Sequence, residues 1–171
     1  MSAFRATDRL LKGARLTKPT WAIIEKPDVW QRSVSQLFDS DILPESLGGK
    51  PENIHLAWQG DKILGIHTAN SLVDTFGRPI HRGVASEIHS MAVSNKFLKN
   101  HFQSLLPYLA NAKDIEPKLT DEIAGTMVET AIARIHAQSQ ANGRRKANEI
   151  IDLSNYLVKS AIVEKIWSGM K

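Results

Sequence analysis

Apolar and polar residues alternate along most of this chain with the period of an α-helix rather than that of a β-strand. The clearest case is 118–140, where an apolar residue recurs at every fourth position: Leu119, Ile123, Met127, Ala131 and Ile135. Such a stripe is typical of an amphipathic helix that buries one face. No stretch shows a sustained two-residue alternation, so the sequence predicts an all-α protein.

The same pattern, together with the positions of helix-breaking proline and glycine residues, predicts further helices. Their expected ranges are 29–38, 54–76, 84–92, 93–109 and 147–167. Loops are expected where turn-forming residues gather, at 41–53, 77–83, 111–117 and 142–145. Ser94 is the expected N-cap of one helix. The last helix has the apolar set Ile150, Ile151, Leu157, Val158, Ile162 and Ile166.

The chain length of 171 residues suits one domain with a short extension. We expect a basic N-terminal extension over 1–24, a helical domain over 25–145, and a C-terminal helix packed on that domain over 146–171. No apolar run is long enough to span a bilayer, so no membrane partner is expected.

The net charge of +4 is compatible with an anionic partner such as nucleic acid. One basic cluster, Arg144, Arg145 and Lys146, is the candidate nucleic-acid-binding group, and a solvated surface is the competing interpretation. The basic start of the chain is compatible with mitochondrial targeting. The chain has no cysteine, which excludes disulfides and a thiol nucleophile and points to an intracellular compartment, mitochondrial or otherwise cytoplasmic.

Three short motifs carry the candidate chemistry. The first is LAWQGDKILG at 56–65, in which Gly60 and Asp61 interrupt an apolar helix. The second is a Gly83-x-x-Ser86 segment followed by Val-Ser-Asn at 93–95, and the third is VETAIARIH at 128–136. An acid among apolar residues is costly unless it meets a metal, a basic group or a helix end.

In order and spacing these motifs resemble the catalytic domain of the ribonuclease III family, over about residues 53–140. The resemblance implies a ribonuclease III-like helical bundle, a symmetric homodimer, and magnesium-dependent cleavage of double-stranded RNA. In that family two facing helices supply four carboxylates, spaced i,i+4 and i,i+3 so that each pair shares a helix face. Carboxylates and waters hold Mg²⁺, which activates water and stabilises charge on the phosphate. The family's aromatic residue falls on Trp58, which is therefore expected in the core.

The family's four acidic positions are only half filled in this chain. The resemblance places the first pair on Ala57 and Asp61 and the second pair on Thr126 and Glu129. Asp61 and Glu129 are therefore the candidate catalytic and metal-binding residues, and a shifted alignment offers Asp121 instead. Two acids leave too little negative charge for a metal pair, so we expect weak Mg²⁺ binding at most. The competing interpretations are an Asp61 that only caps or pairs within the helices, and a Glu129 that is merely solvated.

Three functions follow from this pattern. The first is a pseudoenzyme that binds double-stranded RNA or forms part of a ribonucleoprotein, having lost or weakened cleavage. The second is an active endoribonuclease with a site rebuilt from Asp61, Glu129 and Asp121 or Glu122. The third is a repurposed domain that binds or converts a small molecule, because the emptied cleft would be less acidic and more apolar.

Overall fold

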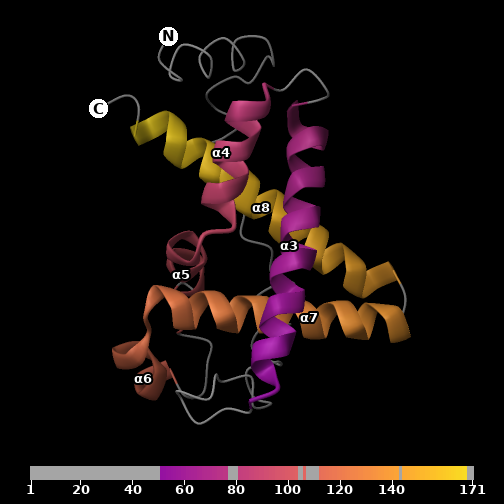
Figure 1. Cartoon of the computed structure of the whole chain (residues 1–171), viewed down its shortest axis with the longest axis vertical. Coiled ribbons are helices and arrows are strands. Elements are labelled where there is room, and N and C mark those ends of the chain that lie inside the picture. The colour runs from indigo at the N-terminus through magenta and orange to yellow at the C-terminus, as the bar shows by residue number, and fades with distance from the viewer. Residues whose placement is uncertain (1–50, 77–80, 104–105, 107–111, 143, 169–171) are drawn as a thin grey trace.

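The computed structural model describes residues 51–76, 81–103, 106, 112–142 and 144–168 (Figure 1). All regular secondary structure in these residues is helical, which confirms the all-α prediction. The predicted N-terminal extension, the predicted helix 29–38 and most of the predicted loop 41–53 lie outside the described residues. None of the described helices combines the length and the apolar character needed to cross a bilayer.

The described elements are six α-helices and one 3-10 turn. They are α3 (Asn53–Phe76), α4 (Arg82–Ala92), α5 (Asn95–Gln103), α6 (Ala112–Ile115), η4 (Glu116–Lys118), α7 (Asp121–Asn142) and α8 (Arg144–Ser168). Helices α3, α4, α7 and α8 match their predicted ranges within a few residues. The helix predicted over 93–109 is confirmed as far as Gln103, and most of its remainder lies outside the described residues.

The loop predicted at 111–117 is wrong, because the chain coils there into α6 and η4. Pro117 lies at the start of η4, where a backbone N–H has no partner within the helix to lose. Pro117 therefore begins a short helical turn rather than marking a loop.

Side-chain caps explain where three helices begin. The Ser94 hydroxyl accepts a hydrogen bond from the Phe97 N–H at 3.3 Å, which confirms Ser94 as the N-cap of α5. The Thr120 hydroxyl accepts one from the Ile123 N–H at 3.2 Å, so α7 begins at Asp121 rather than at 118. At the start of α4 the His81 ring accepts a hydrogen bond from the Gly83 N–H.

Helix α7 is the element on which α3, α5 and α8 pack. Figure 1 shows α3 crossing α7, with α8 running obliquely past both. Helix α8 also packs on α4, to which the Lys165–Glu87 ion pair ties it. Helix α8 therefore packs on α3, α4 and α7, and it begins at Arg144 rather than at 146.

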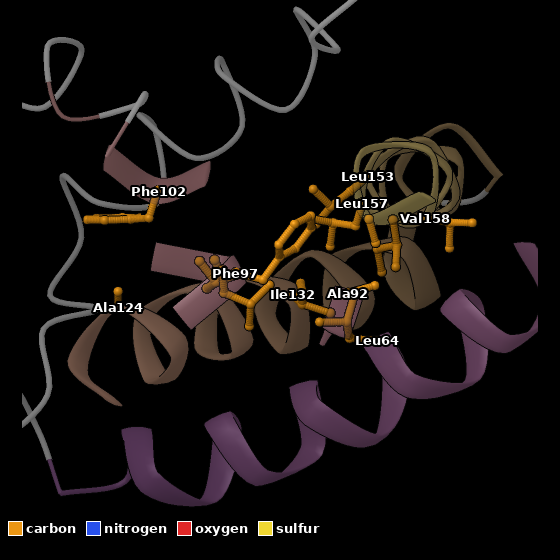
Figure 2. Packing of buried hydrophobic residues seen from close by; sticks show 14 of the residues in the cluster. Leu64, Ala92, Phe97, Phe102, Ala124, Ile132, Leu153, Leu157 and Val158 are labelled. Atoms are coloured by element: carbon orange, nitrogen blue, oxygen red, sulfur yellow. The ribbon is translucent and has the colours of Figure 1, made fainter. Parts of the chain in front are cut away.

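The core lies between these helices. Figure 2 shows Leu64 of α3, Ile132 of α7 and Leu157 of α8 directed into a common apolar cluster. The predicted α7 stripe is confirmed at Met127, Ala131 and Ile135, which have no exposed surface. Buried Val128 and Ile132 widen the buried face beyond that stripe, because α7 is covered from several sides.

Trp58 is not in the core, so that prediction is wrong. Trp58 has 66% of its surface exposed to solvent, whereas the preceding Ala57 is buried. Successive residues of a helix differ by about 100° around its axis, and α3 turns Ala57, Gly60 and Leu64 toward its neighbours. Trp58 consequently projects from another side of α3.

Candidate active site at the crossing of α3 and α7

The two candidate helices touch at their backbones. A Cβ atom built on Gly60 of α3 would lie 1.8 Å from the carbonyl oxygen of Glu129 in α7. Only a residue without a side chain allows so close an approach. The glycine of the Gly60-Asp61 motif therefore sets the distance between the helix that carries Asp61 and the helix that carries Glu129.

This contact brings the two candidate acids into one electrostatic environment. Burial, and after it the negative charge of Asp61, raise the pKa of Glu129 from its ordinary value of 4.5 to about 7. The positive charge of Lys62 acts in the opposite direction. Glu129 is therefore only about half ionised at neutral pH, in contrast to a solvated glutamate.

Asp61 has a basic partner on its own helix. The Lys62 ammonium donates a hydrogen bond to the Asp61 carboxylate at 2.7 Å, and this bond and charge raise the pKa of Lys62. Both side chains keep substantial contact with solvent. The acid in the apolar helix thus lies at the edge of the crossing, where a neighbouring lysine offsets its charge.

The other two acidic positions of the family pattern carry no charge at the crossing. Ala57 is buried on the face of α3 that also carries Gly60. Thr126 is partly buried, and its backbone oxygen accepts a hydrogen bond from the Thr130 hydroxyl at 2.7 Å. Asp61 and Glu129 are consequently the two acids that the candidate alignment contributes here.

The alternative acid Asp121 is engaged elsewhere on α7. It forms an ion pair with Lys99 of α5, with Nζ and Oδ1 3.1 Å apart. Asp121 precedes Glu129 by eight residues, about 12 Å along the helix axis. Glu122, which the rebuilt-site hypothesis also considered, is exposed and separated from Glu129 by about 10 Å of helix. The structure does not gather these acids into one cluster with Glu129.

Further polar contacts join the start of α3 to α7. The Arg134 guanidinium donates to the Asn53 side-chain oxygen at 3.2 Å. The Thr130 hydroxyl, which donates chiefly to the Thr126 backbone oxygen at 2.7 Å, makes a longer, bifurcated contact of 3.4 Å with the Asn53 backbone oxygen. None of the motifs pointed to Asn53. The sequence offers one indication of its role, because asparagine is favoured at the start of a helix. These bonds hold the first turn of α3 against α7.

Asn95, which belongs to the Val-Ser-Asn motif, contacts the same helix. A Cβ atom added to Gly125 would lie 2.1 Å from the Asn95 side-chain oxygen. Gly125 is one turn before Glu129 on α7, so the second and third motifs also meet in space. The sequence motif gives no indication of this contact, because Gly125 lies thirty residues further along the chain.

The basic cluster of Arg144, Arg145 and Lys146 forms the first turn of α8, and the positions of its side chains lie outside the described structure. The described segments contain equal numbers of basic and acidic residues. The net positive charge of the chain therefore resides in the remaining residues, half of it in the first fifty and half in Arg78 and Lys171.

The candidate ligands Asp61 and Glu129 do not form a site that would bind Mg²⁺ tightly. Within the described residues no three or more histidine, cysteine or acidic side chains converge on one point. At the crossing, one carboxylate is paired with Lys62 and the other keeps a proton up to about pH 7. A hard cation requires several ionised or carbonyl oxygens, which this pair does not supply.

Comparisons with protein-family models, curated proteins and solved structures returned no match. The resemblance to ribonuclease III therefore rests on the motif residues of this chain alone.

Because the pKa of Glu129 is raised, the stability of the fold should depend on pH. Between pH 4.5 and 7 the folded chain keeps a proton that the unfolded chain has released, so the free energy of unfolding falls as pH rises and the loss is complete above pH 7. Glu129→Gln removes this titration. We expect the variant to be more stable than the wild type at pH 8 by about 1–2 kcal/mol, after allowance for solvent screening.

Urea denaturation followed by circular dichroism at several pH values measures this effect. Glu122→Gln, at an exposed position of the same helix, is the matched control and should leave the difference between pH 5 and pH 8 unchanged. A Glu129→Gln variant with the full pH dependence of the wild type would contradict the raised pKa.

Proposed function

We propose that this chain is a ribonuclease III-like protein with weakened or lost cleavage, which binds double-stranded RNA as part of a ribonucleoprotein. The observation that carries the proposal is the backbone contact between Gly60 and Glu129, which joins Asp61 and Glu129 at one helix crossing. This is the arrangement that the motif resemblance requires of its two acidic helices. Because Ala57 and Thr126 occupy the other acidic positions, the pair lacks the charge that metal-dependent cleavage needs.

The residues at the crossing supply one glutamate of raised pKa and one Asp61–Lys62 ion pair rather than a metal cage. Glu129, half protonated near pH 7, can donate a hydrogen bond, and Asp61 with Lys62 presents one negative and one positive group. Such a surface accepts contacts from hydroxyls and phosphates of RNA without repelling the backbone as four carboxylates would. RNA affinity then depends mainly on the basic residues outside the crossing.

The other two functions find less support at this crossing. A rebuilt endoribonuclease site would need Asp121 or Glu122 beside Glu129, but Asp121 pairs with Lys99 and both residues lie more than one helical turn away. A small-molecule cleft between the helices would need space where the Gly60 and Glu129 backbones are in contact. The RNA-binding proposal needs neither.

The proposal is tested by binding and cleavage assays on the full chain with a generic RNA duplex. We expect binding that weakens steeply with salt, because each neutralised phosphate releases counterions. Replacing Arg144, Arg145 and Lys146 together by alanine should reduce the slope of log affinity against log salt by up to about 3. A triple variant with Lys113→Ala, Lys118→Ala and Lys159→Ala, at exposed positions elsewhere, removes the same charge and is the control.

Cleavage is measured in the same samples with Mg²⁺ and with Mn²⁺, for the wild type and for Asp61→Asn. We expect no cleavage, or a trace that Asp61→Asn removes. Rapid cleavage that Asp61→Asn abolishes would show an active enzyme and contradict the loss of catalysis. Failure to bind any duplex RNA at low salt would contradict the RNA-binding function itself.

A further inference from the structure

Helix α3 carries a row of apolar side chains on its exposed side. Ile54, Trp58, Ile66 and Val73 are 59, 66, 63 and 48% exposed, respectively. The first three keep the i,i+4 spacing of one helix face, with Lys62 at the intervening position, and Val73 follows seven residues later. We refer to Ile54, Trp58, Ile66 and Val73 as the α3 stripe. Single exposed apolar residues are common on protein surfaces, but a contiguous row is typical of an interaction site.

The opposite side of α3 is already buried. Ala57, Gly60 and Leu64 face the core, so α3 is apolar on two sides. A helix that is apolar all round is normally covered all round. The described helices cover only one of these two sides, so an occupant of the α3 stripe has to come from outside the described residues.

The chain that precedes α3 contains a segment whose pattern matches the stripe. This segment is the helix predicted over 29–38, which lies outside the described residues. Its apolar residues follow the i,i+4,i+7,i+8 spacing of one helix face: Trp30, Val34, Leu37 and Phe38. A helix of this length extends about 15 Å, slightly more than the distance of about 12 Å along α3 between Trp58 and Ile66. So short a helix is not stable alone in water and needs an apolar surface on which to pack.

The charge of the same segment also suits the stripe. The charged residue within the row is Lys62, which is exposed. Residues 28–41 contain three acids, Asp28, Asp39 and Asp41, against Arg32 alone, so their net charge is −2. The rest of the first fifty residues is basic and would repel Lys62. Charge complementarity therefore favours 28–41 over the remainder of the preceding chain.

We propose that the segment 29–38 packs as a helix on the α3 stripe of its own chain and covers Trp58 and Ile66. The fourteen residues 39–52 that connect it to α3 can span more than about 40 Å, whereas the stripe is about 28 Å long. The segment can therefore reach every part of the stripe. A segment joined covalently to its docking surface has an effective concentration in the millimolar range, which favours it over a separate partner.

Substitutions in the full chain test the inference by urea denaturation. Under the segment 29–38, Trp58→Glu should raise the equilibrium constant of unfolding at least about thirtyfold, whereas the same change at an exposed position is nearly neutral. Leu37→Glu should have a similar effect, and both changes together should cost little more than either alone, because they disrupt one contact. Ile151→Glu, at an exposed isoleucine of α8, is the matched control and should change the constant less than about threefold. A neutral Trp58→Glu, or additive effects in the double variant, would overturn the inference.

Because the chain contains no cysteine, a pair of introduced cysteines shows whether the contact lies within one chain. Ser33→Cys lies in the middle of the segment, and Lys62→Cys lies in the middle of the α3 stripe. On oxidation this pair should form a disulfide within one chain at least about tenfold faster than Ser33→Cys combined with Ile151→Cys. A disulfide between two chains would show that a second copy occupies the stripe, and equal rates for the two pairs would show that the segment docks nowhere in particular. Either result would contradict docking within one chain.

Discussion

Gly60→Ala is expected to destabilise the fold by about 3 kcal/mol or more. The added Cβ would lie 1.8 Å from the Glu129 carbonyl oxygen and 2.5 Å from its carbonyl carbon. Both atoms belong to the backbone of α7, so no flexible side chain can move aside. The two helices must separate along their contact, which also opens the packing around Leu64. The usual gain of about 1 kcal/mol from replacing a helical glycine with alanine is too small to offset this.

The matched control lies one turn further along the same helix. A Cβ atom at Gly65 would meet only the His89 ring, at 3.9 Å and 4.0 Å, which is ordinary van der Waals contact. Gly65→Ala should therefore stabilise the chain by about 0.5–1 kcal/mol through helix propensity. Urea denaturation of both variants at one protein concentration measures the difference. Equal stabilities for the two variants would show that α3 and α7 do not meet at Gly60.

Ile150→Ala should cost about 2–5 kcal/mol of unfolding free energy, the usual range for an isoleucine truncated in a packed core. Ile150 is 1% exposed and belongs to the apolar cluster that α8 shares with α3, α4 and α7. The truncation leaves a cavity that rigid helices on several sides cannot close. Thermal or urea denaturation followed by circular dichroism gives the change.

The neighbouring Ile151 provides a control with the same substitution. Ile151 is 41% exposed, so Ile151→Ala should cost less than about 1 kcal/mol. The comparison removes differences in helix propensity, since the residue types and the helix are the same. If the two variants lost equal stability, the orientation of α8 in the fold would be contradicted.

Local pattern determined the helices of this protein. The four-residue stripe of α7, the Ser94 cap of α5, and the break between α7 and α8 were all readable in the sequence, because helix periodicity and capping depend on near neighbours in the chain. The pairing of Asp61 with a basic group was among the sequence interpretations, and Lys62 lies beside it in the chain. The short helical turns around Pro117 were missed because proline also marks loops.

Tertiary structure alone decided which apolar residues are covered and which acids meet. Ile150 and Ile151 belong to one apolar set in the sequence, yet only Ile150 faces the core, and Trp58 lies outside it. The raised pKa of Glu129 depends on a helix that is about seventy residues away in the chain. An apolar helix has no preferred inward face until its neighbours pack, and electrostatic effects act through space rather than along the sequence. The sequence by itself therefore determined the helices and the candidate acids, and the packing of α3 on α7 determined their environment.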